Sequence, residues 1–209
     1  DGDGNRSASY SYDGNENLVS YNEYIIQNGQ NVRTNTFDVS GQMTKYTVYE
    51  RNEKGSSTKS ETYTADGVLE YSYTYEYDSQ GRTMKMSYFE NSALLFYVEY
   101  EYGEGNTPTV TKQYSSDGTL NYITEDDELG REIRFSSYYS GKEIPDYVTV
   151  NEYNEKGFCF RTNGYDGNDQ LTYYSLFTYD ERGKCVKETR YTRQDILSFE
   201  IEYNGTGDQ

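Results

Sequence analysis

Residues 69–82 read LEYSYTYEYDSQGR, and this stretch decides the fold. Tyrosine occupies every second position from Tyr71 to Tyr77, and the positions between are polar. Because successive side chains of a β-strand point to opposite faces, the pattern predicts a strand with one aromatic and one polar face. The sequence Asp78-Ser79-Gln80-Gly81 then suits a three-residue hairpin loop that ends on a left-handed glycine.

This hairpin signal recurs along the chain. Asp/Asn-x-x-Gly turns end at Gly55, Gly81, Gly130, Gly157 and Gly183, with spacings of 26, 49 (two units), 27 and 26 residues. A second series falls between them, at Gly14, Gly41, Gly67, Gly118, Gly141 and Gly167, with degenerate copies near Asn91 and Gln194. Turns about 13 residues apart leave strands of about eight residues.

The fold class that follows is all-β. We expect a repetitive antiparallel meander of about 16 strands, built from about eight two-strand repeats, in a single twisted, spiralled or rolled sheet. The repeat domain is predicted to span residues 10–204, with a disordered or processed tail at 1–9 and a short tail at 205–209. Residues 103–111, which include Pro108, break the pattern and predict a longer loop or bend.

Charged residues also recur with the repeat. A base lies four residues after the turn glycine, and an acid lies five residues before it, as in Glu76 and Lys85. With a three-residue loop, Tyr75 is predicted to face Lys85, so the bases would share the partly buried tyrosine face. Met84, Met86 and the acids would lie on the opposite face, in water. A four-residue loop would instead place acids and bases on one face as diagonal ion pairs, and the sequence leaves both options open.

Composition excludes several classes of function. The 209 residues include 27 Tyr and no Trp, and the formal net charge is -17. So acidic a surface repels nucleic acid and anionic membranes. No apolar stretch reaches the roughly 18 residues that a membrane span needs. Because the first residue is Asp1, in a polar run, we expect a signal peptide or lipid-anchored leader upstream.

The residue types predict neither catalysis nor a cofactor. The chain has no His, which removes the commonest general base and metal ligand. Repeated acids in equivalent surroundings are unlike the unequal carboxylate pair of a glycosidase. Residues 1–5 resemble the start of a calcium loop, but Arg6 and Tyr12 stand where glycine and a bidentate acid are required. We therefore predict no catalytic residue, metal or cofactor.

Two cysteines, Cys159 and Cys185, lie one repeat length apart. Equivalent strands of successive repeats have one strand between them, so their Cα atoms would be about 9.6 Å apart. That separation exceeds the roughly 7 Å limit for a disulfide, and free thiols are predicted.

Two turn segments carry a family resemblance: residues 75–82, YEYDSQGR, and 177–184, FTYDERGK. They resemble the YD repeat of Rhs-type bacterial surface and toxin-shell proteins. The Asp-Gly-x-Leu turn of 66–69 resembles MORN-like variants in bacterial lipoproteins. The resemblance spans about residues 10–204 and implies a secreted or surface-anchored, tyrosine-rich β-sheet. The chain is far too short to enclose a cargo, as the large shells do.

The tyrosine-rich face is the best candidate for function, because rows of rings can stack on sugars or pack against an extended peptide. The alternative is that the rings are only the core of the fold. Candidate binding residues are Tyr71, Tyr73, Tyr75, Tyr77, Lys59, Lys85, Arg134, Arg161 and Lys187. We expect a non-enzymatic extracellular protein that binds glycan or peptide, and we do not predict its oligomeric state. The alternatives are a cell-surface spacer, a partner-binding antitoxin-like module, and a glycan-cleaving enzyme.

Overall fold

The computed structural model describes residues 7–139 and 141–203. The calcium-loop-like start, most of the predicted N-terminal tail and the C-terminal tail lie outside these residues. The strands are β1 (Ala8–Tyr12), β2 (Leu18–Gln27), β3 (Gln30–Asp38), β4 (Met43–Arg51), β5 (Ser57–Thr64), β6 (Leu69–Tyr77), β7 (Thr83–Glu90), β8 (Ala93–Tyr102), β9 (Pro108–Ser115), β10 (Leu120–Asp126), β11 (Glu132–Ser137), β12 (Tyr147–Tyr153), β13 (Cys159–Asp166), β14 (Leu171–Tyr179), β15 (Cys185–Thr192) and β16 (Leu197–Glu202). The first strand thus begins at Ala8, slightly before the predicted start of the repeat domain.

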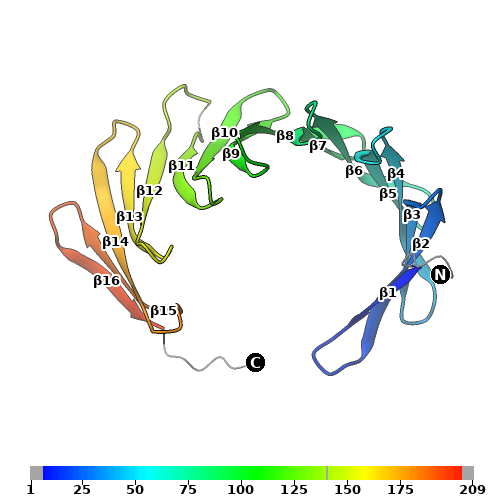
Figure 1. Cartoon of the computed structure of the whole chain (residues 1–209), viewed down its shortest axis with the longest axis horizontal. Coiled ribbons are helices and arrows are strands. Elements are labelled where there is room, and N and C mark those ends of the chain that lie inside the picture. Colours follow the sequence, from blue (N-terminus) through cyan, green and yellow to red (C-terminus); the bar gives the residue numbers. More distant parts are fainter. Residues whose placement is uncertain (1–6, 140, 204–209) are drawn as a thin grey trace. The chain divides into compact units, whose positions relative to one another are not determined.

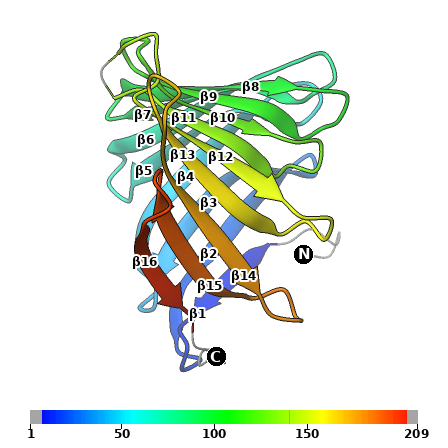
Figure 2. The same ribbon diagram turned by 90° about the vertical axis from the view of Figure 1, so that its left-hand side faces the viewer.

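These strands confirm the predicted all-β meander. They form one 16-stranded sheet in sequence order, and every pairing with a described register is antiparallel. The sheet is open, because β1 and β16 each have a single neighbour in that order. Contacts divide the chain into two compact units, 1–99 and 100–209, and within each unit successive strands lie side by side (Figures 1 and 2).

The three-residue hairpin loop is confirmed at the Asp/Asn-x-x-Gly turns. At Asp78 the backbone N–H bonds to the carbonyl oxygen of Arg82, and Gly81 has a φ of 88°. The Asp78 carboxylate accepts the backbone N–H groups of Gln80 and Arg82, both at 2.9 Å. The same side-chain pattern recurs at Asn52, Asp127, Asn154 and Asp180. The acid or amide at this position therefore helps to hold each of these turns.

A register shift follows almost every turn, and it was not predicted, because the sequence predicted a bulge only at the turn glycine. Each described pairing except β11–β12 contains one register shift. In the β6–β7 hairpin Tyr77 pairs with Thr83, as predicted, but Glu76 then pairs with Lys85, so Met84 is the additional residue. A bulge of this kind also increases the local right-handed twist.

The bulge makes one prediction about the faces wrong. Lys85 lies opposite Glu76 and not opposite Tyr75, whose partner is Met86. Residues directly opposite in an antiparallel pair share a face. The recurring bases therefore lie on the face of the acids, which we call the ion-pair face, while Met86 lies with Tyr71, Tyr73 and Tyr75 on the tyrosine face. The alternative prediction was right that acids and bases share a face. It was wrong about the loop, which has three residues and not four, and about the arrangement, because the recurring acid and base are directly opposite and not diagonal, as Glu76 and Lys85 show.

Buried residues lie on both faces and are mostly small and polar. Among the described residues only Val98 and Val148 are both apolar and buried. Thr62, at 2% exposure, is on the tyrosine face opposite Tyr71, while Ser72 is buried on the ion-pair face. The expectation that the face of the acids is simply in water is therefore wrong. Small residues at mid-strand are covered by longer side chains of neighbouring strands.

The longer loop predicted at residues 103–111 is not formed. The connection between β8 and β9 is 103–107, which has the same five residues as 78–82 between β6 and β7, and 108–111 belong to β9. The long connection follows β11, since β11 ends at Ser137 and β12 begins at Tyr147, and Gly141 does not end a tight turn there. Instead, the Asp146 carboxylate accepts the backbone N–H of Tyr139 at 2.8 Å, and the Asp146 N–H bonds to the Ser137 carbonyl.

Acid is expected to destabilise these turns. The side-chain hydrogen bond from Arg82 holds the pKa of Asp78 below its ordinary value of 3.8, and that from Arg131 does the same for Asp127. A depressed pKa in the folded state gives stability that is present above the unfolded pKa and is lost as the pH falls through the folded pKa. The free energy of unfolding, measured in urea, should therefore drop below about pH 4.

Asparagine is a matched substitute, because Asn52 and Asn154 already hold equivalent turns. The Asp78→Asn and Asp127→Asn double variant should keep the fold at pH 7 and lose less stability in acid than the wild type. An unchanged pH profile would contradict this assignment.

Candidate functional site

Five rings form a cluster on the tyrosine face of the first unit, which we call the tyrosine cluster. Its members are Tyr71, Tyr73 and Tyr75 of β6, Tyr88 of β7 and Phe96 of β8. The bulges place Tyr88 opposite Tyr73 and Phe96 opposite Tyr88. The ring centroids of Tyr73 and Tyr88 are 5.0 Å apart, and those of Tyr88 and Phe96 are 5.1 Å apart. The cluster is a continuous aromatic surface across three strands.

The rings of the cluster are half-buried. Each of the five residues is intermediate in exposure, so part of each side chain meets solvent. Burial raises the pKa of Tyr75 and of Tyr88, so both hydroxyls stay protonated and can donate hydrogen bonds at neutral pH. The neighbouring strand β5 presents the small residues Ser60 and Thr62 to this face.

Tyr77, the fourth tyrosine of the predicted column, makes a different contact. Its hydroxyl donates to the backbone carbonyl of Ser57 at 2.6 Å. Tyr153 and Tyr179 make the equivalent bonds to the carbonyls of Glu132 and Cys159, both at 2.7 Å. At three of the five Asp/Asn-x-x-Gly turns, the tyrosine that precedes the turn thus ties one hairpin to the preceding one. Burial raises the pKa of all three of these tyrosines, consistent with a structural position.

The predicted cations lie in ion pairs on the ion-pair face. Directly opposite pairs are Lys85–Glu99 at 3.4 Å, Arg134–Glu125 at 3.6 Å and Arg161–Glu152 at 3.7 Å. The other two bases pair with an acid of the same strand or of a neighbouring strand: Lys59–Glu61 at 2.7 Å and Lys187–Glu200 at 2.9 Å. The structure therefore does not bring the nine predicted residues together, and it places the five cations away from the tyrosine cluster.

Some of these cations also lie over rings, but over rings of the ion-pair face. Lys85 Nζ is 4.0 Å from the ring centroid of Tyr97, and the Arg161 guanidinium is 4.5 Å from that of Tyr174. The predicted attraction between bases and aromatic rings is present, although with partners other than Tyr71, Tyr73 and Tyr75. Cations lie over these rings and restrict access to them.

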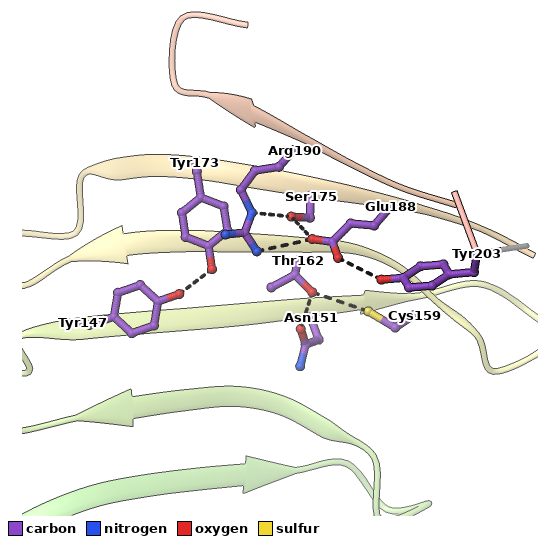
Figure 3. A network of polar contacts seen from close by, with 9 residues as sticks. All are labelled: Tyr147, Asn151, Cys159, Thr162, Tyr173, Ser175, Glu188, Arg190 and Tyr203. Atoms are coloured by element: carbon purple, nitrogen blue, oxygen red, sulfur yellow. Dashed lines mark hydrogen bonds and ion pairs between the residues drawn. The ribbon is translucent and has the colours of Figure 1, made fainter. Parts of the chain in front are cut away.

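The tyrosine face of the second unit carries a polar network (Figure 3). The fully buried Ser175 donates to Glu188 Oε1 at 3.0 Å and accepts from Arg190 Nε at 3.0 Å. The Arg190 guanidinium lies 4.3 Å from the ring centroid of Tyr173, whose hydroxyl bonds to that of Tyr147. Side chains of successive strands therefore hold this face together through hydrogen bonds.

Sequence reasoning missed Tyr88, Phe96 and Arg190. Tyr88 and Phe96 lie in ordinary strand patterns, and only the strand register brings them to Tyr73. Arg190 lies seven residues after Gly183, outside the recurring basic position. Glu188 and Arg190 are two residues apart on β15, so the strand pattern predicts that they share a face. This spacing was the signal that could have pointed to Arg190.

No metal or redox centre emerges from the part of the chain described. Within residues 7–139 and 141–203, no group of three or more His, Cys, Asp or Glu side chains is placed to hold a metal ion. Cys159 and Cys185 are free thiols, and the Cys159 Sγ lies 3.4 Å from the Arg161 carbonyl oxygen. No helix among the described residues is long and apolar enough to cross a membrane.

This geometry defines the class of protein as an all-β hairpin-repeat protein. Scans of protein-family models and of curated proteins found no match. Solved structures give distant similarities of fold. A TcdB2-TccC3-Cdc42 structure is 12% identical with a TM-score of 0.29, covering 93% of this chain and 14% of that chain. A porin-like protein from Bacteroides uniformis is 13% identical with a TM-score of 0.36, covering 94% and 86%. The chain thus spans only a small part of the Tc toxin chain, and no functional statement follows from either similarity.

Proposed function

We propose that this chain is a non-enzymatic, extracellular or surface-anchored repeat protein that binds neutral glycan through the tyrosine cluster. The observation that carries the proposal is the continuous set of five half-buried rings across β6, β7 and β8. A tyrosine ring can pack on the apolar C–H face of a sugar ring while its hydroxyl bonds to sugar hydroxyls. The YD-repeat-like turns support placing the protein among bacterial surface proteins.

Neutral glycan is favoured over acidic glycan by the distribution of charge. The five recurring cations pair with acids on the ion-pair face, so they do not offer positive charge beside the cluster. The net charge of -17 also disfavours an anionic ligand.

Binding of the full chain to an array of neutral glycans tests this proposal. The Tyr73→Leu and Tyr88→Leu double variant keeps apolar volume in the cluster but removes two rings and their hydroxyls. We expect it to bind at least about tenfold more weakly, a loss of about 1.4 kcal/mol of binding free energy. Circular dichroism checks that the variant is folded.

The matched control is Tyr10→Leu, which removes a tyrosine that is 58% exposed on β1, outside the cluster. It should bind as the wild type does. Equal binding by the double variant would contradict the proposal, and so would failure of the wild type to bind any glycan. Binding to an extended-peptide array alone would assign the cluster to peptide, and binding to neither would favour a structural spacer.

A further inference from the structure

A hollow recurs where two successive Asp/Asn-x-x-Gly turns lie beside each other. The tetrapeptide Asn-Glu-Lys-Gly occurs twice, at 52–55 in the first unit and at 154–157 in the second. In each case the next turn of this series begins with Tyr-Asp, at Tyr77-Asp78 and Tyr179-Asp180. These segments line a hollow of about 340 Å³ in the first unit and one of about 500 Å³ in the second.

The hollow of the second unit, which we call the phenylalanine hollow, differs from its counterpart in its rings. Phe158, Phe160 and Phe177 line it together with Tyr179. The positions that correspond to Phe158 and Phe160 in the first unit, counted from the turn glycine, are Ser56 and Thr58. The two sites share the same turn, and only the phenylalanine hollow has phenylalanine rings in its lining.

Two of these rings are fixed by packing, and a third is accessible. Phe158 and Tyr179 are stacked with centroids 4.9 Å apart, and the Phe158 ring packs against Gly183. Phe160 is the additional residue of the β12–β13 bulge and is 38% exposed. Because Phe160 is partly exposed at the bulge, part of this ring can contact a ligand.

The rim of the phenylalanine hollow carries both signs of charge. Glu155, Lys156 and Asp180 line it beside the rings. An anionic ligand would meet two carboxylates and a cationic ligand would meet an ammonium group, whereas a neutral polyol can donate to the carboxylates and accept from the lysine. Rings beside a few convergent polar groups, in a volume of this size, are typical of small-ligand sites.

We propose that the phenylalanine hollow is a second sugar-binding site, for a disaccharide-sized part of a neutral glycan. This inference extends the proposed glycan binding to a site on other strands, so the two sites can be tested separately. The counterpart in the first unit has the turn, the lysine and Tyr77 but lacks the phenylalanine rings, and it is expected to bind more weakly.

The test measures binding of neutral disaccharides to the full chain by saturation-transfer NMR, with a panel that includes cellobiose, lactose and N,N′-diacetylchitobiose. The Phe160→Thr variant introduces the residue that occupies the equivalent position in the first unit. It should bind at least about tenfold more weakly than the wild type, with an unchanged circular dichroism spectrum. The matched control is Met84→Thr, which changes an exposed bulge residue of the β6–β7 hairpin and should bind as the wild type does.

Three outcomes would overturn the inference: no disaccharide of the panel binds, Phe160→Thr binds as tightly as the wild type, or Met84→Thr loses as much as Phe160→Thr. The Tyr73→Leu and Tyr88→Leu variant keeps the two proposals apart. If array binding depends on those tyrosines while disaccharide binding ignores Phe160, only the second site fails. If disaccharide binding depends on Phe160 while array binding ignores the tyrosines, only the proposal for the tyrosine cluster fails.

Discussion

Replacing Gly183 by alanine is expected to lower the free energy of unfolding by about 2–5 kcal/mol, which combines two costs. Gly183 has a φ of 80°, where an L-residue with a Cβ costs about 1–2 kcal/mol. An added Cβ would also lie 2.6 Å from Phe158 Cζ. The Phe158 ring cannot move freely, because it is stacked on Tyr179, so the repacking adds about 1–3 kcal/mol.

Gly81 is the matched control for this substitution. It occupies the equivalent turn position with a φ of 88°, and an added Cβ would meet nothing within 4 Å. Gly81→Ala should therefore cost only the conformational part, about 1–2 kcal/mol. Urea unfolding of both variants measures the difference. If both variants lose the same free energy of unfolding, the contact between Phe158 and Gly183 adds no cost to the Gly183→Ala substitution, and the prediction is wrong.

Removing the Ser175 hydroxyl is expected to lower the free energy of unfolding by about 1–3 kcal/mol, because a buried hydrogen-bonding group is lost. Ser175 is fully buried, and its hydroxyl joins Arg190 to Glu188. In Ser175→Ala the Glu188 carboxylate, whose side chain is 14% exposed, loses a donor and Arg190 loses an acceptor. Urea unfolding at pH 7 measures the loss.

Ser72 supplies the control for the hydroxyl. It is also buried, at 6% exposure, and within the described residues no hydrogen bond to its hydroxyl is seen. Ser72→Ala should cost less than Ser175→Ala. A loss as large as that of Ser175→Ala would mean that the cost comes from removing the serine and not from breaking the network of Arg190 and Glu188.

Turns and strands could be predicted from the sequence because both depend on local chemistry. Asp78 and Gly81 suit their positions through local chemistry alone, since one caps the turn and the other has a positive φ. Alternating tyrosines then fix which residues of β6 share a face. These local signals were sufficient to predict the meander and to predict that Tyr71, Tyr73 and Tyr75 share a face.

The bulges could not be predicted in this way. Their additional residues include Met84, Glu70 and Phe160, which share no chemical type. A shift of one residue moves a side chain to the other face, so missing the bulge placed Lys85 beside Tyr75 and not beside Glu76. The same shift determines that Tyr88 and Phe96 complete the tyrosine cluster, and for that reason the site was only partly predicted.

The claim that the tyrosine cluster binds glycan is tested most directly by NMR of the ring signals of the full chain with ¹³C-labelled tyrosine. The titrant is the neutral glycan that binds most tightly on the array. We predict that the ring signals of Tyr71, Tyr73, Tyr75 and Tyr88 shift together along one saturable curve, while the signal of Tyr10 stays in place. Saturating glycan that leaves those four signals unmoved would contradict the account.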